Sequence, residues 1–374
     1  MDTKILEIGF DAKRAFLNGS GLGNYSRTLI TNLQKFYPEN NYNLFTPKVS
    51  DVYFETYSNF KIQLPQTTFD KHFPAFWRSY SATLNFNKLN LNVYHGLSNE
   101  LPQNILKFKG KKIVTIHDLI FMRYPKLYKP LDRKIYEKKV KHACKFADVI
   151  IAISEQTKND LVIFFGINPN KIKVLYQAVD ERFLKPNSDE ELQKVKNKYN
   201  LPNNYLLFVS TIEERKNLQS ILKAMVDLPE QKLIVVGKKT DYFKGLEIYI
   251  AENVLGERVR FLDKVSNDDL PKIYALASIF IYPSLFEGFG IPIIEAIASK
   301  VPVITTKGGC FAEAGGEAAI YTKYGDLEEL KHAIVSLTEN KDLRNQLINE
   351  GQKHILNFYP EKTSKELMEL YTEV

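Results

Sequence analysis

The most informative stretch of the chain reads Ser284-Leu285-Phe286-Glu287-Gly288-Phe289-Gly290-Ile291-Pro292-Ile293-Ile294-Glu295. Pro292 suits the first position of a helix, because the N–H group that proline lacks would have no partner there. The apolar residues around and after it supply the buried side of that helix. We therefore expect Glu287 in the loop before the helix and Glu295 about one turn inside it.

This loop and helix start combine two kinds of binding group. The first turn of a helix presents free N–H groups, which favour anions or polar oxygens, while carboxylates accept hydrogen bonds from hydroxyls. Gly288 and Gly290 allow the backbone to come close to a ligand. A ligand that carries both phosphates and sugar hydroxyls matches this combination.

Length and composition predict a globular protein of two domains. The chain has 374 residues, which exceeds a single ordinary core, and 44% of them are apolar. Its two cysteines, Cys144 and Cys310, indicate small buried side chains in a reducing compartment and argue against a disulfide framework. We see no signal peptide and no apolar run long enough to span a bilayer, so we expect a cytoplasmic protein.

Short apolar runs alternate with helix-like segments in two series, separated by a charged segment at 185–200. Repeated strand–helix units require a parallel sheet covered by helices. The sequence thus predicts an α/β protein with two doubly wound, Rossmann-like domains, residues 1–184 and 185–357, whose ligands bind beyond the carboxyl ends of the strands and in the cleft between domains. The expected strands are 5–10, 92–94, 112–116, 148–153, 171–175, 205–209, 232–236, 259–262, 279–282 and 303–305. We also expect a helix over 24–37 and one that begins at Glu155 with Ser154 as its N-cap.

Three further motifs each follow an expected strand. Gly19, Gly21 and Gly23 alternate just before the helix at 24–37, so they form either a loop that faces phosphate or an ordinary flexible loop. They lack the Gly-x-Gly-x-x-Gly spacing of a dinucleotide site. Arg215 and Lys216 stand between a strand end and a helix that begins near Asn217, where a guanidinium beside an ammonium suits a diphosphate.

His117 and Asp118 follow the strand at 112–116. A histidine there can bond a sugar hydroxyl or orient a leaving group, and Asp118 can fix its tautomer or cap the next helix. His95 has a similar location and a weaker claim, and either histidine can instead be structural.

Basic residues crowd the stretch 107–145 of this chain of net charge +7. They form either a solvated helix face or a surface that rests on anionic lipid or accepts an anionic substrate. Nucleic-acid binding is the weaker interpretation, because no recognised module accompanies the charge.

Together these motifs resemble the retaining nucleotide-sugar glycosyltransferases of the GT-B fold, specifically the large fourth family and its mannosyltransferase-like members. Glu287 and Glu295 fit the family's pair of glutamates with seven residues between them, and Arg215-Lys216-Asn217-Leu218 is similar to its phosphate-binding pair. The resemblance covers nearly the whole chain and implies that residues 358–374 form a helix that crosses back onto the first domain. One departure is Lys307–Gly316, where Glu313 keeps the family's acidic place but its proline is absent.

The resemblance implies transfer of a sugar from a nucleotide diphosphate donor to an acceptor hydroxyl, with the anomeric configuration kept and with no metal or other cofactor. GDP-mannose is the favoured donor, and the acceptor is expected to be a glycan or a lipid-linked glycan at the inner membrane face, within cell-surface polysaccharide or lipopolysaccharide synthesis. By the same resemblance His117 contacts the sugar, Arg215 and Lys216 neutralise the diphosphate, Glu295 binds the ribose, and the loop of Gly19, Gly21 and Gly23 closes over the phosphates. The remaining donor contacts are Glu287 with Gly288, Phe289, Gly290 and Ile291 at the sugar, and Gly237, Leu262 and Val265 near the base.

Three alternatives stay open at this point. A nucleotide-sugar epimerase would bind a similar donor without an acceptor, and a nicotinamide-dependent dehydrogenase would need a proper dinucleotide loop. A non-catalytic scaffold would have no need of both glutamates and the Arg-Lys pair.

Overall fold

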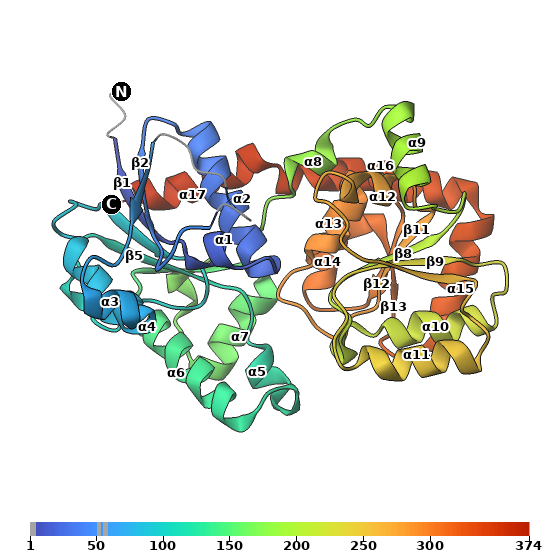
Figure 1. Ribbon diagram of the computed structural model, residues 1–374, viewed down its shortest axis with the longest axis horizontal. Coiled ribbons are helices and arrows are strands. Elements are labelled where there is room, and N and C mark those ends of the chain that lie inside the picture. The colour runs from blue at the N-terminus through green and yellow to red at the C-terminus, as the bar shows by residue number, and fades with distance from the viewer. Residues whose placement is uncertain (1–4, 51–53, 55–58, 374) are drawn as a thin grey trace. The chain divides into compact units, whose positions relative to one another are not determined.

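The computed structural model describes residues 5–50, 54 and 59–373. The chain forms two compact units, which we call unit 1 (Met1–Ala178 with Pro360–Val374) and unit 2 (Val179–Tyr359) (Figure 1). The sequence placed the first boundary six residues later, at 184/185. Helix α8 (Glu181–Leu184) belongs to unit 2 because the ring of Phe183 packs edge-on against Tyr274 and Arg182 pairs with Asp268.

Unit 1 is built on a seven-stranded sheet in the order β3-β2-β1-β4-β5-β6-β7, and every strand pair in it is parallel. The five strands that the sequence predicted here are confirmed to within two or three residues at their ends. The sequence missed β2 and β3, because Asn41 and Asn43 interrupt the apolar pattern of β2 and β3 is a short edge strand. The strands are β1 (Glu7–Asp11), β2 (Asn41–Phe45), β3 (Phe60–Gln63), β4 (Val93–Gly96), β5 (Lys111–Ile116), β6 (Val149–Ala152) and β7 (Ile172–Val174).

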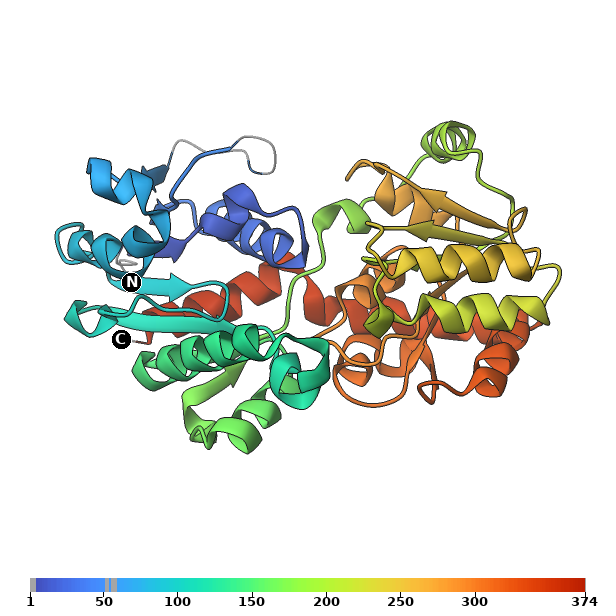
Figure 2. The same cartoon turned by 60° about the horizontal axis from the view of Figure 1, so that its bottom comes forward.

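Helices cover both faces of this sheet and enclose one apolar core on each. The C-terminal helix α17 packs on unit 1 beside α2, and Figures 1 and 2 show it in red along the sheet. Its apolar residues join side chains of β1, β4 and β5 in one core, which confirms the return of the chain's end to the first domain. The helices of unit 1 are α1 (Lys13–Leu17), α2 (Gly21–Phe36), α3 (Thr68–His72), α4 (Pro74–Phe76), α5 (Ile120–Arg123), α6 (Pro130–Phe146), α7 (Glu155–Phe165) and α17 (Pro360–Thr372).

Unit 2 repeats the plan with a six-stranded parallel sheet in the order β10-β9-β8-β11-β12-β13. All five predicted strands are present, and the sequence missed only the edge strand β13 among those described. The strands are β8 (Leu206–Val209), β9 (Leu233–Val236), β10 (Val259–Leu262), β11 (Ile279–Tyr282), β12 (Val303–Thr306) and β13 (Ala319–Thr322).

Three of the longer helices of unit 2, α9, α15 and α16, begin at residues whose side chains accept a free N–H of the first turn. Ser188 and Glu191 form a reciprocal capping box on α9, and Asp326 caps α15. The helices are α9 (Asp189–Lys198), α10 (Leu218–Val226), α11 (Phe243–Glu252), α12 (Leu270–Ala275), α13 (Ile291–Ala298), α14 (Cys310–Gly315), α15 (Leu327–Glu339) and α16 (Lys341–His354). Across the described residues of both units, the structure contains no helix with the length and apolar character needed to cross a bilayer.

The glycine motif of unit 1 is part of a helix rather than a loop before one. Helix α2 begins at Gly21, three residues earlier than predicted, because Ser20 occupies the N-cap position and its N–H donates to Asn18 Oδ1. A Cβ atom at Gly23 would lie 1.8 Å from the carbonyl oxygen of Asn18, so this glycine lets the first turn pack against the preceding chain. Around Gly21, by contrast, the space is open.

We therefore expect opposite effects from two alanine substitutions in the same turn. Gly23→Ala forces backbone against backbone and should lower the melting temperature by several degrees, whereas Gly21→Ala should be neutral or stabilising by up to about 1 kcal/mol, as alanine replaces glycine in a helix. Thermal unfolding of both variants measures this difference. Equal melting temperatures would contradict the close contact.

Candidate functional site

The order of strands in unit 2 brings the cationic pair and the glutamate motif together. Strand β8 leads into a 3₁₀ turn at Glu214–Lys216, and β11 leads into the loop that carries Glu287. Strands β8 and β11 are neighbours and parallel, so both segments leave the same edge of the sheet. The backbone N–H of Leu285 donates to the carbonyl of Arg215 at 2.8 Å, which joins the two segments directly.

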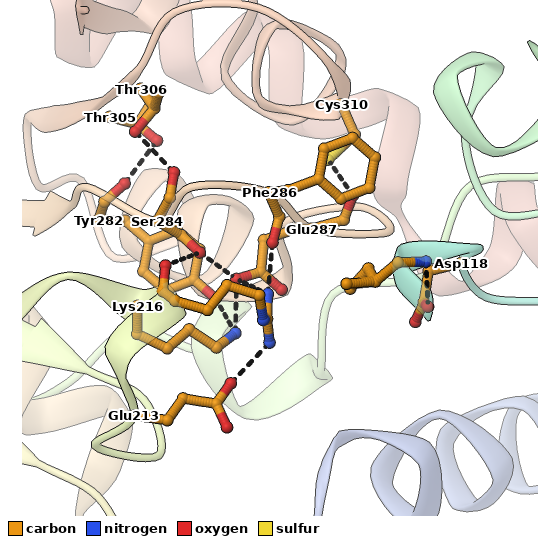
Figure 3. Close-up of polar contacts among 12 residues, drawn as sticks. Asp118, Glu213, Lys216, Tyr282, Ser284, Phe286, Glu287, Thr305, Thr306 and Cys310 are labelled. Atoms are coloured by element: carbon orange, nitrogen blue, oxygen red, sulfur yellow. Dashed lines mark hydrogen bonds and ion pairs between the residues drawn. The ribbon is translucent and has the colours of Figure 1, made fainter. Parts of the chain in front are cut away.

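One carboxylate oxygen, Glu287 Oε1, is the centre of this site (Figure 3). It lies 2.5 Å from Lys216 Nζ and 2.9 Å from a terminal nitrogen of Arg215. It also accepts hydrogen bonds from the hydroxyls of Ser284 at 2.5 Å and Tyr282 at 3.1 Å. The other oxygen, Oε2, has no bonding partner in the described part of the chain.

The two cations keep this buried carboxylate ionised. Burial by itself raises the pKa of Glu287, but the charges of Lys216 and Arg215 outweigh it and hold the pKa at about 2. Burial lowers the pKa of Lys216, and the neighbouring charge of Glu287 opposes that shift. The site therefore presents a fixed negative charge that two cations already hold.

The cations retain donors beyond these contacts. Arg215 uses three of its five N–H groups, toward Glu287, the carbonyl of Phe286 and Glu213, and Lys216 uses two of its three, toward Glu287 and Tyr282. The sequence predicted a cationic pair suited to a diphosphate, and the structure shows that both cations are also bonded to acidic side chains. Its remaining donors can still serve phosphate oxygens.

Strand β12 fixes the loop that carries Glu287. The hydroxyls of Thr305 and Thr306 donate to the carbonyls of Tyr282 and Ser284, each at 2.8 Å. The thiol of Cys310, on α14, contacts the carbonyl of Glu287 at 3.2 Å. Figure 3 shows these contacts around the loop. The position of the Glu287 carboxylate is thus set partly by these side-chain contacts to the backbone of its loop.

The turn between the two glutamates is shaped by Gly290. This residue is the N-cap of α13 and has a φ of +146°, a value that residues with a Cβ rarely adopt. Phe289 is buried and packs on Phe358, so its side chain anchors the turn in the core. Ile291 starts α13, and Pro292 stands at the second helical position, one later than predicted.

Glu295 lies in α13, about one turn from its start as expected, and it has a different environment from Glu287. The hydroxyl of Tyr274 donates to Glu295 Oε2 at 3.0 Å. Burial raises the pKa of Glu295 to about 8, and the charge of Asp180 adds to that shift. Its Oε1 has no partner among the residues that the structure describes, so one oxygen can serve a ligand.

The residues proposed near the base follow the next two strands. Gly237 follows β9, and a Cβ atom there would lie 1.8 Å from the carbonyl oxygen of Ser210. Leu262 is the last residue of β10 and is buried, whereas Val265 is partly exposed in the loop beyond it. The parallel sheet therefore places all three at the edge from which Lys216 and Glu287 also emerge.

His117, in unit 1, directly follows β5 and is buried. Its Nε2 lies 2.8 Å from the carbonyl oxygen of Leu97, so Nε2 carries the proton and Nδ1 is an acceptor. Burial lowers the pKa of His117 to about 4, which keeps the ring neutral. Asp118 does not fix this tautomer, and instead accepts the N–H of Ile120 at 3.1 Å at the start of α5.

The first turn of α2 keeps its anion-binding character although it is not a loop. No described residue accepts the N–H groups of Gly21, Leu22 and Gly23, as is usual for the first turn of a helix. Gly19 precedes the N-cap Ser20. The motif therefore offers backbone donors in a fixed geometry.

Sequence reasoning missed Ser284, Tyr282 and Tyr274, whose hydroxyls hold the two glutamates. Ser284 was visible inside the glutamate motif, and Tyr282 ends a predicted strand that points to the same edge. Tyr274 belongs to α12 and carried no signal, because its role depends on how α12 packs against α13.

Comparison with known proteins covers most of the chain. Residues 19–183 match the family described as Glycosyltransferase Family 4, and residues 189–354 match the family described as Glycosyl transferases group 1. The two matches correspond closely to the two units of the fold.

Two relatives carry the name of a mannosyltransferase, and one solved structure has a similar fold. The chain is 29% identical to O-antigen chain mannosyltransferase B of Escherichia coli over 256 residues, which are 66% of each chain. It is 27% identical to the O-antigen chain mannosyltransferase RfbU of Salmonella typhimurium, over 87% of this chain and 89% of that one. Its fold is similar to that of HepE from Anabaena, solved with UDP and glucose, with a TM-score of 0.78, 18% identity and coverage of 99% and 100%.

The raised pKa of Glu295 predicts a pH-dependent cost to stability. Between pH 4.5 and about 8 the folded protein keeps a proton that the unfolded chain releases, so stability should fall as the pH rises, by at most about 1.4 kcal/mol per unit. Glu295→Gln keeps an acceptor for Tyr274 and cannot ionise, so its melting temperature should rise relative to the native chain between pH 5 and pH 8. The exposed Glu247→Gln is the control, and parallel curves for all three proteins would refute the prediction.

Proposed function

The chain belongs to the GT-B glycosyltransferases of the fourth family, and from that premise we propose that it transfers a sugar from a nucleotide diphosphate to an acceptor hydroxyl with retention of configuration. One observation carries the proposal. Glu287 is held ionised by Lys216 and Arg215 through a single oxygen, while its second oxygen has no described partner. A sugar hydroxyl and a diphosphate can therefore bind side by side.

The diphosphate is assigned to the unused donors of Arg215 and Lys216. Negative charge grows on the phosphate oxygen as the bond to the sugar breaks, so these contacts strengthen in the transition state. The free N–H groups in the first turn of α2, with Gly21 and Gly23, are a separate anion-binding feature of unit 1, and the family resemblance assigns them to phosphate. Because the two cations of unit 2 can neutralise a diphosphate as a divalent metal does elsewhere, we propose a reaction without a metal.

The hydroxyls of the donor sugar and of the ribose are assigned to acceptor atoms that have no other described partner. Glu287 Oε2 and His117 Nδ1 each accept a hydrogen bond from a hydroxyl of the donor sugar. Glu295 receives the ribose hydroxyls through its Oε1. Gly237, Leu262 and Val265 border the base.

We assign no carboxylate as the nucleophile. Glu287 is a weak base, because its pKa is about 2 and one of its oxygens already has four partners. We propose instead that the acceptor attacks the face from which the phosphate departs, and that a phosphate oxygen takes the proton of the acceptor hydroxyl.

Mannose from GDP-mannose is the proposed donor, and the mannosyltransferase names of two relatives support it. Those relatives act on O-antigen chains, which supports a glycan or lipid-linked glycan as acceptor in cell-surface polysaccharide synthesis. The structural relative solved with UDP and glucose makes a UDP-sugar the competing donor.

We expect GDP-mannose to raise the melting temperature of the native protein more than UDP- or ADP-sugars do. Arg215→Ala and Lys216→Ala should each lower turnover by about two orders of magnitude or more, as expected when a donor to developing charge is lost. Lys223→Ala, an exposed lysine of α10, is the control. The assay is mannose transfer to a lipid-linked glycan in EDTA, with the anomeric configuration of the product read by NMR.

Three outcomes would remove this account. Near-normal turnover in both variants would exclude the diphosphate site, and an inverted product would exclude retention. Conversion of the donor without any acceptor would favour an epimerase.

The basic stretch at 107–145 is proposed to contact anionic lipid. Part of its charge is already paired, since Arg123 pairs with Asp160, Lys139 with Glu100 and Lys112 with Asp148. Other members are exposed on and before α6, among exposed apolar side chains. The exposed lysines include Lys126, Lys129, Lys134 and Lys138, and the exposed apolar residues beside them are Leu127, Leu131, Ile135 and Tyr136.

We expect the protein to co-sediment with vesicles that contain phosphatidylglycerol and not with pure phosphatidylcholine. Lys134→Glu with Lys138→Glu should weaken this binding roughly tenfold or more, because each basic residue near an anionic surface contributes about 1 kcal/mol. Lys223→Glu with Lys244→Glu, on unit 2, is the matched control. Binding that ignores both lipid charge and the first pair of substitutions would contradict the assignment.

A further inference from the structure

A chain of buried polar side chains runs through unit 1 from the last turn of α17 to the neighbour of His117. The hydroxyl of Tyr371 lies 2.6 Å from His95 Nδ1. The other nitrogen of that ring, His95 Nε2, lies 2.8 Å from Thr115 Oγ1, and Thr115 Oγ1 lies 2.9 Å from the hydroxyl of Tyr25. The ring of Tyr25 then meets the ring of His117 edge-on, with centroids 4.6 Å apart.

The sheet brings these groups onto one face. His95 lies on β4 and Thr115 on the neighbouring β5, and alternation along each strand turns both toward the core that contains Tyr371. Tyr25 comes from α2, which packs against α17. His117 has the same parity as Thr115, so it lies one step further along the same face.

The hydrogen-bonded series of Tyr371, His95, Thr115 and Tyr25 lies in surroundings that are otherwise apolar. Tyr371 and His95 are fully buried among aliphatic and aromatic side chains. A buried polar group without a partner costs about 1–3 kcal/mol, so each member stabilises the placement of the next. Removal of one member of the series leaves a polar atom of its neighbour without a hydrogen-bond partner.

The donors and acceptors of this hydrogen-bonded series can be assigned. Burial lowers the pKa of His95 to about 3, so its ring is neutral and has one donor and one acceptor nitrogen. If Tyr371 donates to Nδ1, then Nε2 donates to Thr115 and Thr115 donates to Tyr25. The opposite direction would leave the hydrogen of Tyr371 in the core, where no described residue accepts it, whereas the favoured direction leaves over the hydrogen of Tyr25, which is only partly buried. The geometry therefore favours donation from Tyr371 toward Tyr25.

His117 is fixed by two contacts, of which only the contact with Tyr25 depends on this series of hydrogen bonds. Leu97 accepts its Nε2–H, and Tyr25 limits the rotation of its ring from the side. The ring of Tyr25 is in turn held by its hydroxyl at Thr115.

We propose that Tyr371 is a positioning residue for His117, acting through His95, Thr115 and Tyr25. The docking of α17 on unit 1 then sets the orientation of the imidazole that accepts the sugar hydroxyl. The kinetic part of this inference rests on the proposed function of His117, whereas the structural part does not.

The test begins with Tyr371→Phe, which removes one hydroxyl and keeps the ring. The control is Tyr42→Phe, since Tyr42 is buried in the same core and its hydroxyl is also hydrogen-bonded, to the carbonyls of Leu33 and Tyr37. Both variants should lose similar thermal stability. Only Tyr371→Phe should lower kcat, by about tenfold, with little change in KM for the donor, because misplacement of a contacting group acts mainly on the transition state.

A double-mutant cycle separates positioning from general destabilisation. In a His117→Ala background, Tyr371→Phe should have no further effect on kcat if it acts through His117. Full additivity of the two effects would overturn the proposal, and so would equal kcat losses in Tyr371→Phe and Tyr42→Phe.

An NMR measurement tests the structural part without activity. In protein labelled with nitrogen-15 at its six histidines, Tyr371→Phe should shift the ring signals of both His95 and His117, and Tyr42→Phe should shift neither His117 nitrogen. A shift confined to His95 would overturn the proposal. If His117→Ala were fully active while the NMR shifts appeared, the proposed role of His117 would fail and the positioning would stand.

Discussion

The ionised carboxylate of Glu287, buried between Lys216 and Arg215, is the interaction on which the rest of the site depends. A buried charge without partners is costly, and here two cations and two hydroxyls surround a single oxygen. Because Glu287 Oε1 already has four partners, Oε2 is the carboxylate oxygen that can accept a hydrogen bond from a ligand. The same contacts restrain the guanidinium and the ammonium, so the groups that we propose to bind a diphosphate are already ordered.

Strand order decides whether this interaction can form. Glu287 and Lys216 are far apart in sequence and meet because β8 and β11 are adjacent and parallel. The sequence predicted that each motif follows a strand, since apolar runs and glycine-rich turns mark strand ends. It could not predict adjacency from those signals, which is why the resemblance to a known family was needed to place the motifs together. The edge strands β3 and β13 escaped prediction because half-buried edges lack a continuous apolar run, and the interior strand β2 escaped because Asn41 and Asn43 interrupt its apolar pattern.

Unit 1 shows the limit of pattern reasoning at the level of single residues. The alternating glycines predicted a phosphate-facing segment, but Gly23 also has a packing reason, since its backbone meets Asn18. His117 was predicted from its position after a strand, while its tautomer depends on the carbonyl of Leu97, from another strand end. From the sequence, His95 has a similar position after a strand and a weaker claim to a functional role than His117. Its partner Tyr371 is 276 residues away, and no local signal reports such a contact.

Burial acts on three ionisable groups of the proposed sites and gives each a different state at neutral pH. Glu287 is ionised because the two cations outweigh its burial, Glu295 keeps its proton because burial outweighs the hydrogen bond from Tyr274, and His117 is neutral because burial outweighs its hydrogen bond to the carbonyl of Leu97. An ionised Glu287 can only accept hydrogen bonds, which suits a hydroxyl-rich ligand. A protonated Glu295 can accept on one side and donate on the other. Because hydroxyls that donate to Glu295 favour its charged form, the binding of a ribose there is coupled to loss of a proton, and this coupling follows from burial alone.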